Sequence, residues 1–294
     1  MPYSLIDVPS ALGLWPSGVQ DLGRVLLDHG LDARLGAPVA ARLMPGTYVR
    51  EKDAGTGYLN GPAIRDLALR VAEAVAGVRA AGRTPVILGG DCSVMLGGLV
   101  ALRRAGRSGL FYLDGHADFY DGSGDHSGEV ADMGLAIATG HNHPLLSDIE
   151  GLAPYIRPGD AVAFGLRDEG EAAADGSPPV PGRGIALFDL PRLRAEGRRP
   201  CLAAALAVLS APGIGPVWLH FDTDVIDDRL NPAVDYPLPG GLDWNEAAEV
   251  MAALRGTGRL AGLSVSIFNP RKDPDGRIAI ALTDCLVAGL RGAR

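Results

Sequence analysis

Short uncharged apolar runs that alternate with helix-like stretches are the feature that most constrains how this chain can fold. The apolar runs have the length of strands buried on both faces of a sheet: 85–88, 110–113, 161–164, 217–221 and 263–268. Stretches rich in Ala, Leu and Arg, typical of helices, lie between them at 63–80, 96–103, 202–209 and 245–254. This alternation predicts an α/β fold with a central parallel sheet flanked by helices.

The alternation extends over nearly the whole chain and predicts one domain, residues 1–294. One segment, 168–184 (DEGEAAADGSPPVPGRG), is polar and rich in Pro and Gly, which is typical of a loop. Because strands and helices are expected on both sides of it, we interpret this segment as a surface excursion and not as a linker between domains.

Composition and charge exclude several classes of function. The chain carries 27 Lys and Arg against 35 Asp and Glu, a formal charge of -8, so no nucleic-acid-binding or membrane-binding surface is expected. The longest uncharged apolar run, 201–209, is much shorter than the roughly 18–20 residues that cross a membrane. Neither Lys52 nor Lys272 follows a glycine, which excludes a Walker A phosphate loop.

The first residues and the cysteines favour a cytoplasmic location. Residues 1–9 lack a positively charged region followed by an apolar one, so no secretory signal is expected. Cys92, Cys201 and Cys285 are odd in number and far apart in the sequence, which favours reduced thiols over a disulfide framework. We therefore expect a soluble, cytoplasmic protein.

Three of the predicted strands are followed directly by residues that can bind metal ions. The segments are GGDCS at 89–93, DGHAD at 114–118 and DTD at 222–224. In an open parallel sheet, functional groups collect at the carboxyl ends of the strands. In extended backbone, residues two apart project the same way, so Asp114, His116 and Asp118 should converge, as should Asp222 and Asp224.

This concentration of carboxylates predicts a metal site. Unpaired buried carboxylates repel one another and their pKa values rise, whereas divalent cations allow all of them to stay ionised. Oxygen ligands with one imidazole favour manganese-like ions over a structural zinc. A single aspartate after a strand is more often a helix cap or turn former, but the coincidence of three such segments favours the metal site.

At these residues the chain resembles the ureohydrolase superfamily, which includes arginase, agmatinase and formimidoylglutamase. The motifs that carry the resemblance, in order, are IDVPSALG, GGDCS against GGDHS, DGHAD against DAHxD, FGLRDEGE, HFDTDVIDD against SFDxDxxDP, PGGL and a closing FNP. The resemblance implies a three-layer arginase-type fold, a small-molecule substrate and a homo-oligomer, either trimer or hexamer. It also implies two Mn²⁺ ions, or other divalent metals, that share a hydroxide and hydrolyse a C–N bond of an amidine or guanidine.

The resemblance implies six metal ligands. Asp114 and Asp222 would bridge the two ions, Cys92 and Asp118 would complete one site, and His116 and Asp224 the other. Cys92 stands where the family motif has histidine, and as a thiolate it would be a softer, anionic ligand. The alternative is a buried thiol that does not bind metal. The exchange is similar to the hydroxyarginine-hydrolysing branch of the superfamily, which implies a substrate less basic than arginine.

The loop that follows the DGHAD motif also departs from the family pattern. Residues 127–134 read SGEVADMG against SGNxHGMP, so Ala131 replaces a histidine that serves in proton transfer. We expect His126 to act in its place, because imidazole is the usual proton shuttle near neutral pH. His141 and His143 are further alternatives, although a solvated loop position is the simpler interpretation for both.

The third departure is Ile267, which replaces the glutamate of the family's ExNP motif that clamps the guanidinium. Isoleucine cannot pair with a cation, so either the substrate is less cationic or another carboxylate supplies the charge. We expect Glu129 or Asp132 to do so, with Ser127 also binding substrate. Glu129 is favoured because it lies in the substrate loop without an obvious structural partner, and we expect it to act in catalysis together with Asp118.

Two other functions remain open from the sequence. A non-catalytic or regulatory member of the family would also keep the fold and the metal ligands while losing the residues at Ala131 and Ile267. A nucleotide-binding protein is disfavoured because no G-x-G-x-x-G opens a helix.

Arg167, at the end of a predicted strand, is expected to form structural contacts.

Overall fold

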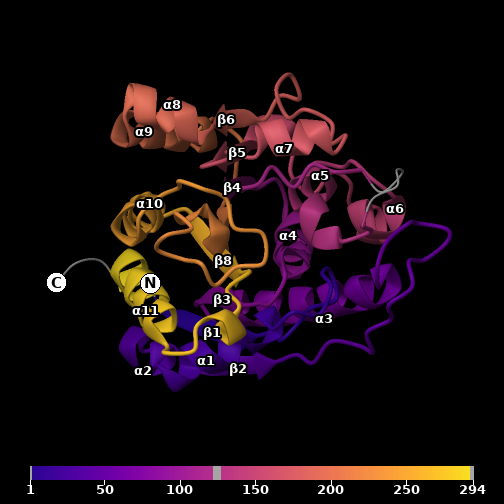
Figure 1. Cartoon of the computed structure of the whole chain (residues 1–294), viewed down its shortest axis with the longest axis horizontal. Helices are drawn as coiled ribbons and strands as arrows, with labels where there is room; N and C mark the ends of the chain where they lie inside the picture. Colours follow the sequence, from indigo (N-terminus) through magenta and orange to yellow (C-terminus); the bar gives the residue numbers. More distant parts are fainter. Residues whose placement is uncertain (1, 122–126, 292–294) are drawn as a thin grey trace.

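A single parallel sheet forms the centre of the molecule. The computed structural model describes residues 2–121 and 127–291. Within them, eight strands pair in the order β2-β1-β3-β8-β7-β4-β5-β6, and every pairing between them is parallel (Figure 1). The strands are β1 (Tyr3–Asp7), β2 (Val39–Arg42), β3 (Thr84–Leu88), β4 (Gly109–Leu113), β5 (Ala161–Phe164), β6 (Ala186–Phe188), β7 (Val217–Asp222) and β8 (Leu260–Ser266).

Helices cover both faces of this sheet, which confirms the predicted three-layer α/β fold. One face packs against α3 (Gly61–Ala80), α4 (Met95–Ala105) and α5 (Gly134–Ala138). The other face packs against α1 (Leu22–Asp28), α2 (Leu31–Leu35), α8 (Leu190–Glu196), α9 (Arg198–Leu209), α10 (Trp244–Gly256) and α11 (Arg277–Arg291). Alternate strand residues supply the two cores: Leu110 and Tyr112 face α4, whereas Phe111 and Leu113 face the opposite layer.

The predicted strands and helices are confirmed, with shifts of a few residues at their ends. β8 begins at Leu260, three residues before the predicted start. The prediction missed these residues because Gly262 interrupts the apolar run. The edge strands β2 and β6 carried no signal: β2 reads VAAR and is mostly exposed, so it lacks the apolar pattern of a buried strand. Within the described residues, no helix is both long enough and apolar enough to cross a membrane.

The sequence predicted a loop over the whole segment 168–184, and this prediction is wrong for its first part. Glu169–Ala174 forms the short helix α7, and the prolines follow it in irregular backbone. Ala and Glu favour helix, and glutamates in the first turn interact well with the helix dipole. This correction bears on function because α7 lies beside the pocket described below.

The sheet order brings the motif-bearing loops together. β7 lies between β8 and β4, and β3 lies on the far side of β8. Because the strands are parallel, the loops that follow β3, β4, β7 and β8 all emerge at one edge of the sheet. The GGDCS, DGHAD and DTD segments and the closing FNP segment therefore meet at this edge.

Candidate metal centre and active site

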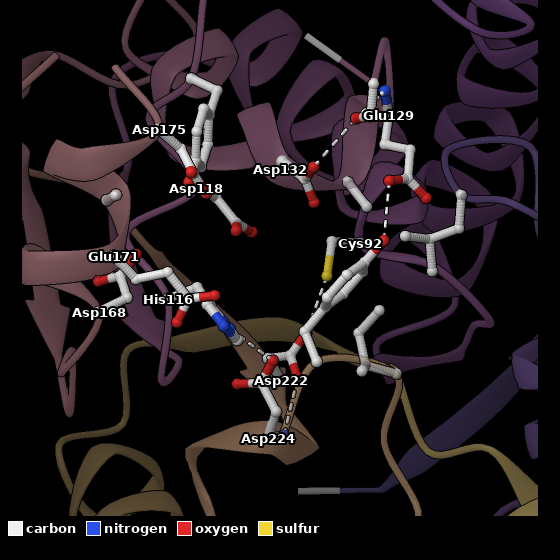
Figure 2. A pocket seen from close by; sticks show the side chains of 17 residues that line it. Cys92, His116, Asp118, Glu129, Asp132, Asp168, Glu171, Asp175, Asp222 and Asp224 are labelled. Carbon is white, nitrogen blue, oxygen red and sulfur yellow. Dashed lines mark hydrogen bonds and ion pairs between the residues drawn. The ribbon is translucent and has the colours of Figure 1, made fainter. Parts of the chain in front are cut away.

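A pocket of about 370 Å³ opens over the carboxyl ends of β4 and β7. Figure 2 shows Cys92, Asp222 and Asp224 at its base, with carboxylates on two opposing walls. The sequence-predicted residues Cys92, His116, Asp118, Ser127, Glu129, Asp132, Asp222 and Asp224 all line this pocket. Asp114 lies buried next to them, since its carboxylate is grouped with those of Asp222 and Asp224.

The GGDCS segment places Cys92 at the base of the pocket. Asp91 caps the single 3-10 turn Cys92–Val94, because its Oδ1 accepts from the Ser93 amide at 2.9 Å. Its Oδ2 accepts from Ser10 Oγ at 2.9 Å, so Asp91 is fully used in structure. A Cβ at Gly90 would lie 1.7 Å from the Ser10 carbonyl oxygen, which explains why this position requires glycine.

Two groups of ligand atoms form at the base, and both include Asp114. The first consists of Cys92, Asp114, His220 and Asp222, whose ligand atoms all lie within 4.8 Å of one another. The second consists of Asp114, His116 and Asp224, within the same limit. Cys92 Sγ donates to Asp222 Oδ2 at 2.8 Å, and His116 Nδ1 lies 2.9 Å from Asp224 Oδ2.

Asp118 lines the pocket but belongs to neither group. Its Oδ2 accepts a hydrogen bond from Tyr112 Oη at 2.5 Å, and its backbone is left-handed, with a φ of 45°. Tyr112 projects from β4 beneath the pocket, so this bond fixes the direction of the Asp118 carboxylate. The five other predicted ligands lie in the groups above: Cys92, Asp114, His116, Asp222 and Asp224.

Burial and mutual repulsion perturb the charges of this cluster. Burial, followed by the charges of neighbouring aspartates, raises the pKa of Asp114 well above its usual value. Burial likewise raises the pKa values of Asp222 and Cys92. Burial disfavours a charged His116, but Asp224 outweighs this effect and raises the pKa of His116 to about 10. A set of buried acids with raised pKa values is the environment that a divalent cation stabilises.

Two buried polar atoms in the first group have no partner among the described residues. They are Asp114 Oδ2 and His220 Nε2, which lie 3.8 Å apart. Buried polar atoms without a partner are rare and call for a ligand, an ion or water. The donor set therefore fits a bound metal ion. Sequence reasoning missed His220, because a histidine inside the apolar run 217–221 looks like part of the core.

Arg167 supports the second group from outside the pocket. Its Nη2 donates to the main-chain oxygens of Asp224, Ile226 and Leu238, at 2.6, 3.3 and 3.2 Å. These bonds tie the end of β5 to the loop that carries Asp224. The contacts of Arg167 are structural and do not reach into the pocket.

One wall of the pocket carries Glu129, and here one expectation is wrong. Glu129 is only 3% exposed and has two structural partners. Its Oε1 accepts from the Trp15 amide at 2.8 Å and its Oε2 accepts from Tyr236 Oη at 2.9 Å. Both partners lie far away in the sequence, which is why the sequence did not reveal them. The carboxylate is therefore held rigidly at the pocket wall.

The same wall contains the other residues of the 127–134 loop. Ser127 Oγ donates to Asp132 Oδ2 at 3.4 Å and accepts from the Glu129 amide at 3.1 Å. Burial, and then the charge of Glu129, raises the pKa of Asp132 to about 7. Ala131 and Ile267 also line the pocket, so aliphatic side chains stand where the family patterns place histidine and glutamate.

The opposite wall was missed by sequence reasoning. Asp168, Glu171 and Asp175 come from α7 and its flanks, and Figure 2 shows them across the pocket from Glu129. Asp168 Oδ2 accepts from the Ala117 amide at 2.9 Å, which attaches this wall to the DGHAD loop. The available signal was the four-residue spacing of Glu171 and Asp175, which places both on one face of a helix.

Two of the three histidines proposed to replace the missing one at Ala131, His141 and His143, do not line this pocket. His126 lies outside the described residues. His141 packs against the ring of Phe119, with centroids 5.1 Å apart, and His143 caps α6 (Pro144–Ser147) by accepting from the Leu145 amide. Both line a different surface hollow, which favours the simpler interpretation of a loop position for these two residues.

The sequence and the fold are both similar to those of known proteins. The model of the Arginase family matches residues 36–290. Arginase from Bacillus caldovelox is 30% identical over 305 aligned positions that cover 97% of both chains. Its native structure at pH 5.6 superposes with a TM-score of 0.89 over 100% of this chain and 99% of that one, at 27% identity. The proclavaminate amidino hydrolase of Streptomyces clavuligerus shares the fold, with a TM-score of 0.72 at 18% identity, over 98% of this chain and 90% of that one. The chain therefore belongs to the arginase family.

Proposed function

We propose that this protein is a hydrolase with two divalent metal ions, preferably Mn²⁺, that cleaves a C–N bond of a guanidino, hydroxyguanidino or amidine compound. The observation that carries the proposal is the pair of ligand groups that share Asp114 at the base of the pocket. Membership of the arginase family supports this class of reaction, since the relatives compared above are named as an arginase and an amidino hydrolase.

The proposed ligands follow from the donors present at the base. Asp114 and Asp222 would be shared by the two ions, His116 and Asp224 would hold one of them, and Cys92 and Asp118 the other. The two groups support a shared Asp114 and the assignment of Cys92 and His116 to different ions, whereas a shared Asp222 rests on the family resemblance. Asp118 lines the pocket, where its hydrogen bond to Tyr112 holds it. When bound, ions of this kind act as Lewis acids and make water nucleophilic near neutral pH.

The walls would bind and orient the substrate. Glu129 is held by two hydrogen bonds, so it can pair with a cationic group at little entropic cost. Asp132 has a pKa of about 7 and can therefore hold or release a proton at its carboxylate near neutral pH. We propose Glu129, Asp132 and Ser127 for substrate binding, and Asp118, Glu129 and His126 for catalysis.

The aliphatic positions narrow the substrate class. Ile267 offers no charge to a guanidinium, so any positive charge on the head group would have to be paired by Glu129 or Asp132 alone. This favours a less basic head group, such as an N-hydroxyguanidine, over arginine.

We further propose a single domain that acts in the cytoplasm as a homo-oligomer, a trimer or hexamer.

The test starts with metal content. The protein would be purified with Mn²⁺ and the bound metal counted by elemental analysis in the parent, in Cys92→Ser and in Cys92→His. We expect two ions per chain in the parent, fewer in Cys92→Ser and two again in Cys92→His. Hydrolysis of hydroxyguanidines, guanidines and formimino compounds would then be screened. Stoichiometric metal without hydrolysis of any of these would overturn the enzymatic proposal in favour of a non-catalytic, metal-binding member of the family.

A further inference from the structure

We infer that His220 supplies a further metal-binding imidazole to the first ligand group, beside Cys92 and in addition to the six ligands proposed above. The inference deepens the proposed function and rests on it. It begins from the side chain's position: on β7, Trp218, His220 and Asp222 project to the same face, so the imidazole lies one strand step below the Asp222 carboxylate. His220 is fully buried.

The Nε2 atom of His220 faces the Oδ2 atom of Asp114 across a gap. Nε2 lies 3.8 Å from Asp114 Oδ2, which is too long for a hydrogen bond, and neither atom has a partner among the described residues. Full burial disfavours a charged imidazole, so the contact is not stabilised as an ion pair. A cation that binds nitrogen and carboxylate oxygen at roughly 2.0–2.2 Å would satisfy both atoms at once.

A hydrogen bond and a stacked aromatic ring fix the orientation of the His220 imidazole, as is usual for a metal-binding histidine. Nδ1 lies 2.9 Å from Ser264 Oγ, and this oxygen also accepts from Trp218 Nε1 at 3.2 Å. Tyr112 stacks on the imidazole with ring centroids 4.8 Å apart and planes 27° apart. When Nδ1 donates to Ser264, the lone pair of Nε2 points toward Asp114. A second nitrogen fixed by a hydrogen bond is the usual support of a metal-binding histidine.

His220 would return an imidazole to a group that has lost one. Cys92 stands where the motif of related chains has histidine, and the ligand atoms of Cys92 and His220 fall in the same group, within 4.8 Å. The group then offers one sulfur, one nitrogen and the oxygens of Asp114 and Asp222. Cys92 and His220 would therefore act together with these carboxylates, at a site where the family motif supplies one histidine.

Two substitutions at this position separate the ligand atom from the ring's structural role. His220→Asn retains a polar group near the position of Nδ1, within reach of Ser264, but lacks an atom at the position of Nε2. His220→Gln extends to the position of Nε2 with an amide. The matched control is His141→Asn, a partly exposed histidine away from the pocket. Circular dichroism and thermal unfolding in EDTA would establish that each variant is folded.

The readout is the binding of Mn²⁺ and Co²⁺ to the metal-free chain, by elemental analysis and competition titration. We expect His220→Asn to bind one of the two ions at least about 100-fold more weakly, because loss of supporting groups alone already costs 10–100-fold. His220→Gln should fall between His220→Asn and the parent, and His141→Asn should match the parent. Two ions bound by folded His220→Asn at parental affinity would overturn the inference and leave the proposed function standing.

A measurement on the parent protein covers the case in which the variants do not fold. X-ray absorption of the Co²⁺-loaded parent should show, on average, one imidazole per metal ion, from His116 and His220. Half an imidazole per ion would overturn the role of His220. A parent chain that binds no metal would overturn the proposed function and this inference together.

Discussion

Removal of the metal ions should make the stability of this protein fall as the pH rises. The metal-free pocket contains carboxylates whose pKa values are raised by desolvation, among them the buried Asp114 and Asp222 and the partly exposed Asp132. The folded chain therefore holds protons that the unfolded chain has already released. This contribution to stability is fully present below the unfolded pKa of about 4 and is lost as the pH rises through the folded pKa.

Asp132 allows the size of the effect to be worked out. Its pKa rises from 3.8 to about 7, a difference of about 3 units, and each unit corresponds to about 1.4 kcal/mol. The full loss between about pH 4 and pH 7 is therefore about 4 kcal/mol, and less where the pocket admits water to the partly exposed side chain. Since 1 kcal/mol shifts Tm by about 2–4 °C in chains of 150–250 residues, we expect roughly 10 °C from this residue.

The assay compares Tm at about pH 4.5 and pH 7.5 in EDTA for the parent and for Asp132→Asn, which cannot titrate at this position. The parent should lose more Tm over this interval than the variant does, by roughly 10 °C. Added Mn²⁺ should restore stability, and more so at the higher pH, because the ligands must lose their protons to bind it. Parallel pH profiles of parent and variant, or a larger gain from Mn²⁺ at the lower pH, would refute the reasoning.

Three further predictions concern single side chains. Glu129→Gln should raise KM at least about 10-fold with the fold intact, because glutamine keeps one hydrogen-bond acceptor but no charge; steady-state kinetics with an unchanged KM would contradict it. Tyr112→Phe should weaken metal binding about 10–100-fold, because it removes the hydrogen bond that holds the Asp118 carboxylate. A metal titration that shows parental affinity would argue against this role of Tyr112. Gly98→Ala should lower the free energy of unfolding, measured with urea, by about 1–3 kcal/mol, since the new Cβ would lie 2.4 Å from the Trp218 ring. The control Gly77→Ala meets nothing within 4 Å and should be neutral or stabilising. Equal effects of the two substitutions would contradict the packing argument.

The sequence predicted those parts of the fold that local pattern controls. The runs that became β3, β4, β5 and β7 are apolar on both faces because they lie inside the sheet, and such runs are visible without a structure. β2 escaped notice because it is an exposed edge strand, held by pairing with β1 and not by burial. Its register depends on a partner far away in the sequence.

The metal-binding segments could be predicted because their residues are close in sequence, whereas the walls of the pocket could not. Trp15 and Tyr236 reach Glu129 from distant loops, and no local signal predicts such contacts. The acidic wall on α7 was hidden by its Pro- and Gly-rich surroundings. His220 looked like a core residue because its neighbours are apolar, and its place beside Asp114, in a group of ligand atoms, emerges only in the folded chain.

The central claim is that two metal ions share Asp114 at the base of this pocket. The most direct test is a crystal structure of the Mn²⁺-loaded protein with anomalous difference maps recorded at the manganese edge. The account predicts two peaks per chain, both within bonding distance of the Asp114 and Asp222 carboxylates. A single peak, or peaks away from these carboxylates in a fully loaded crystal, would contradict it.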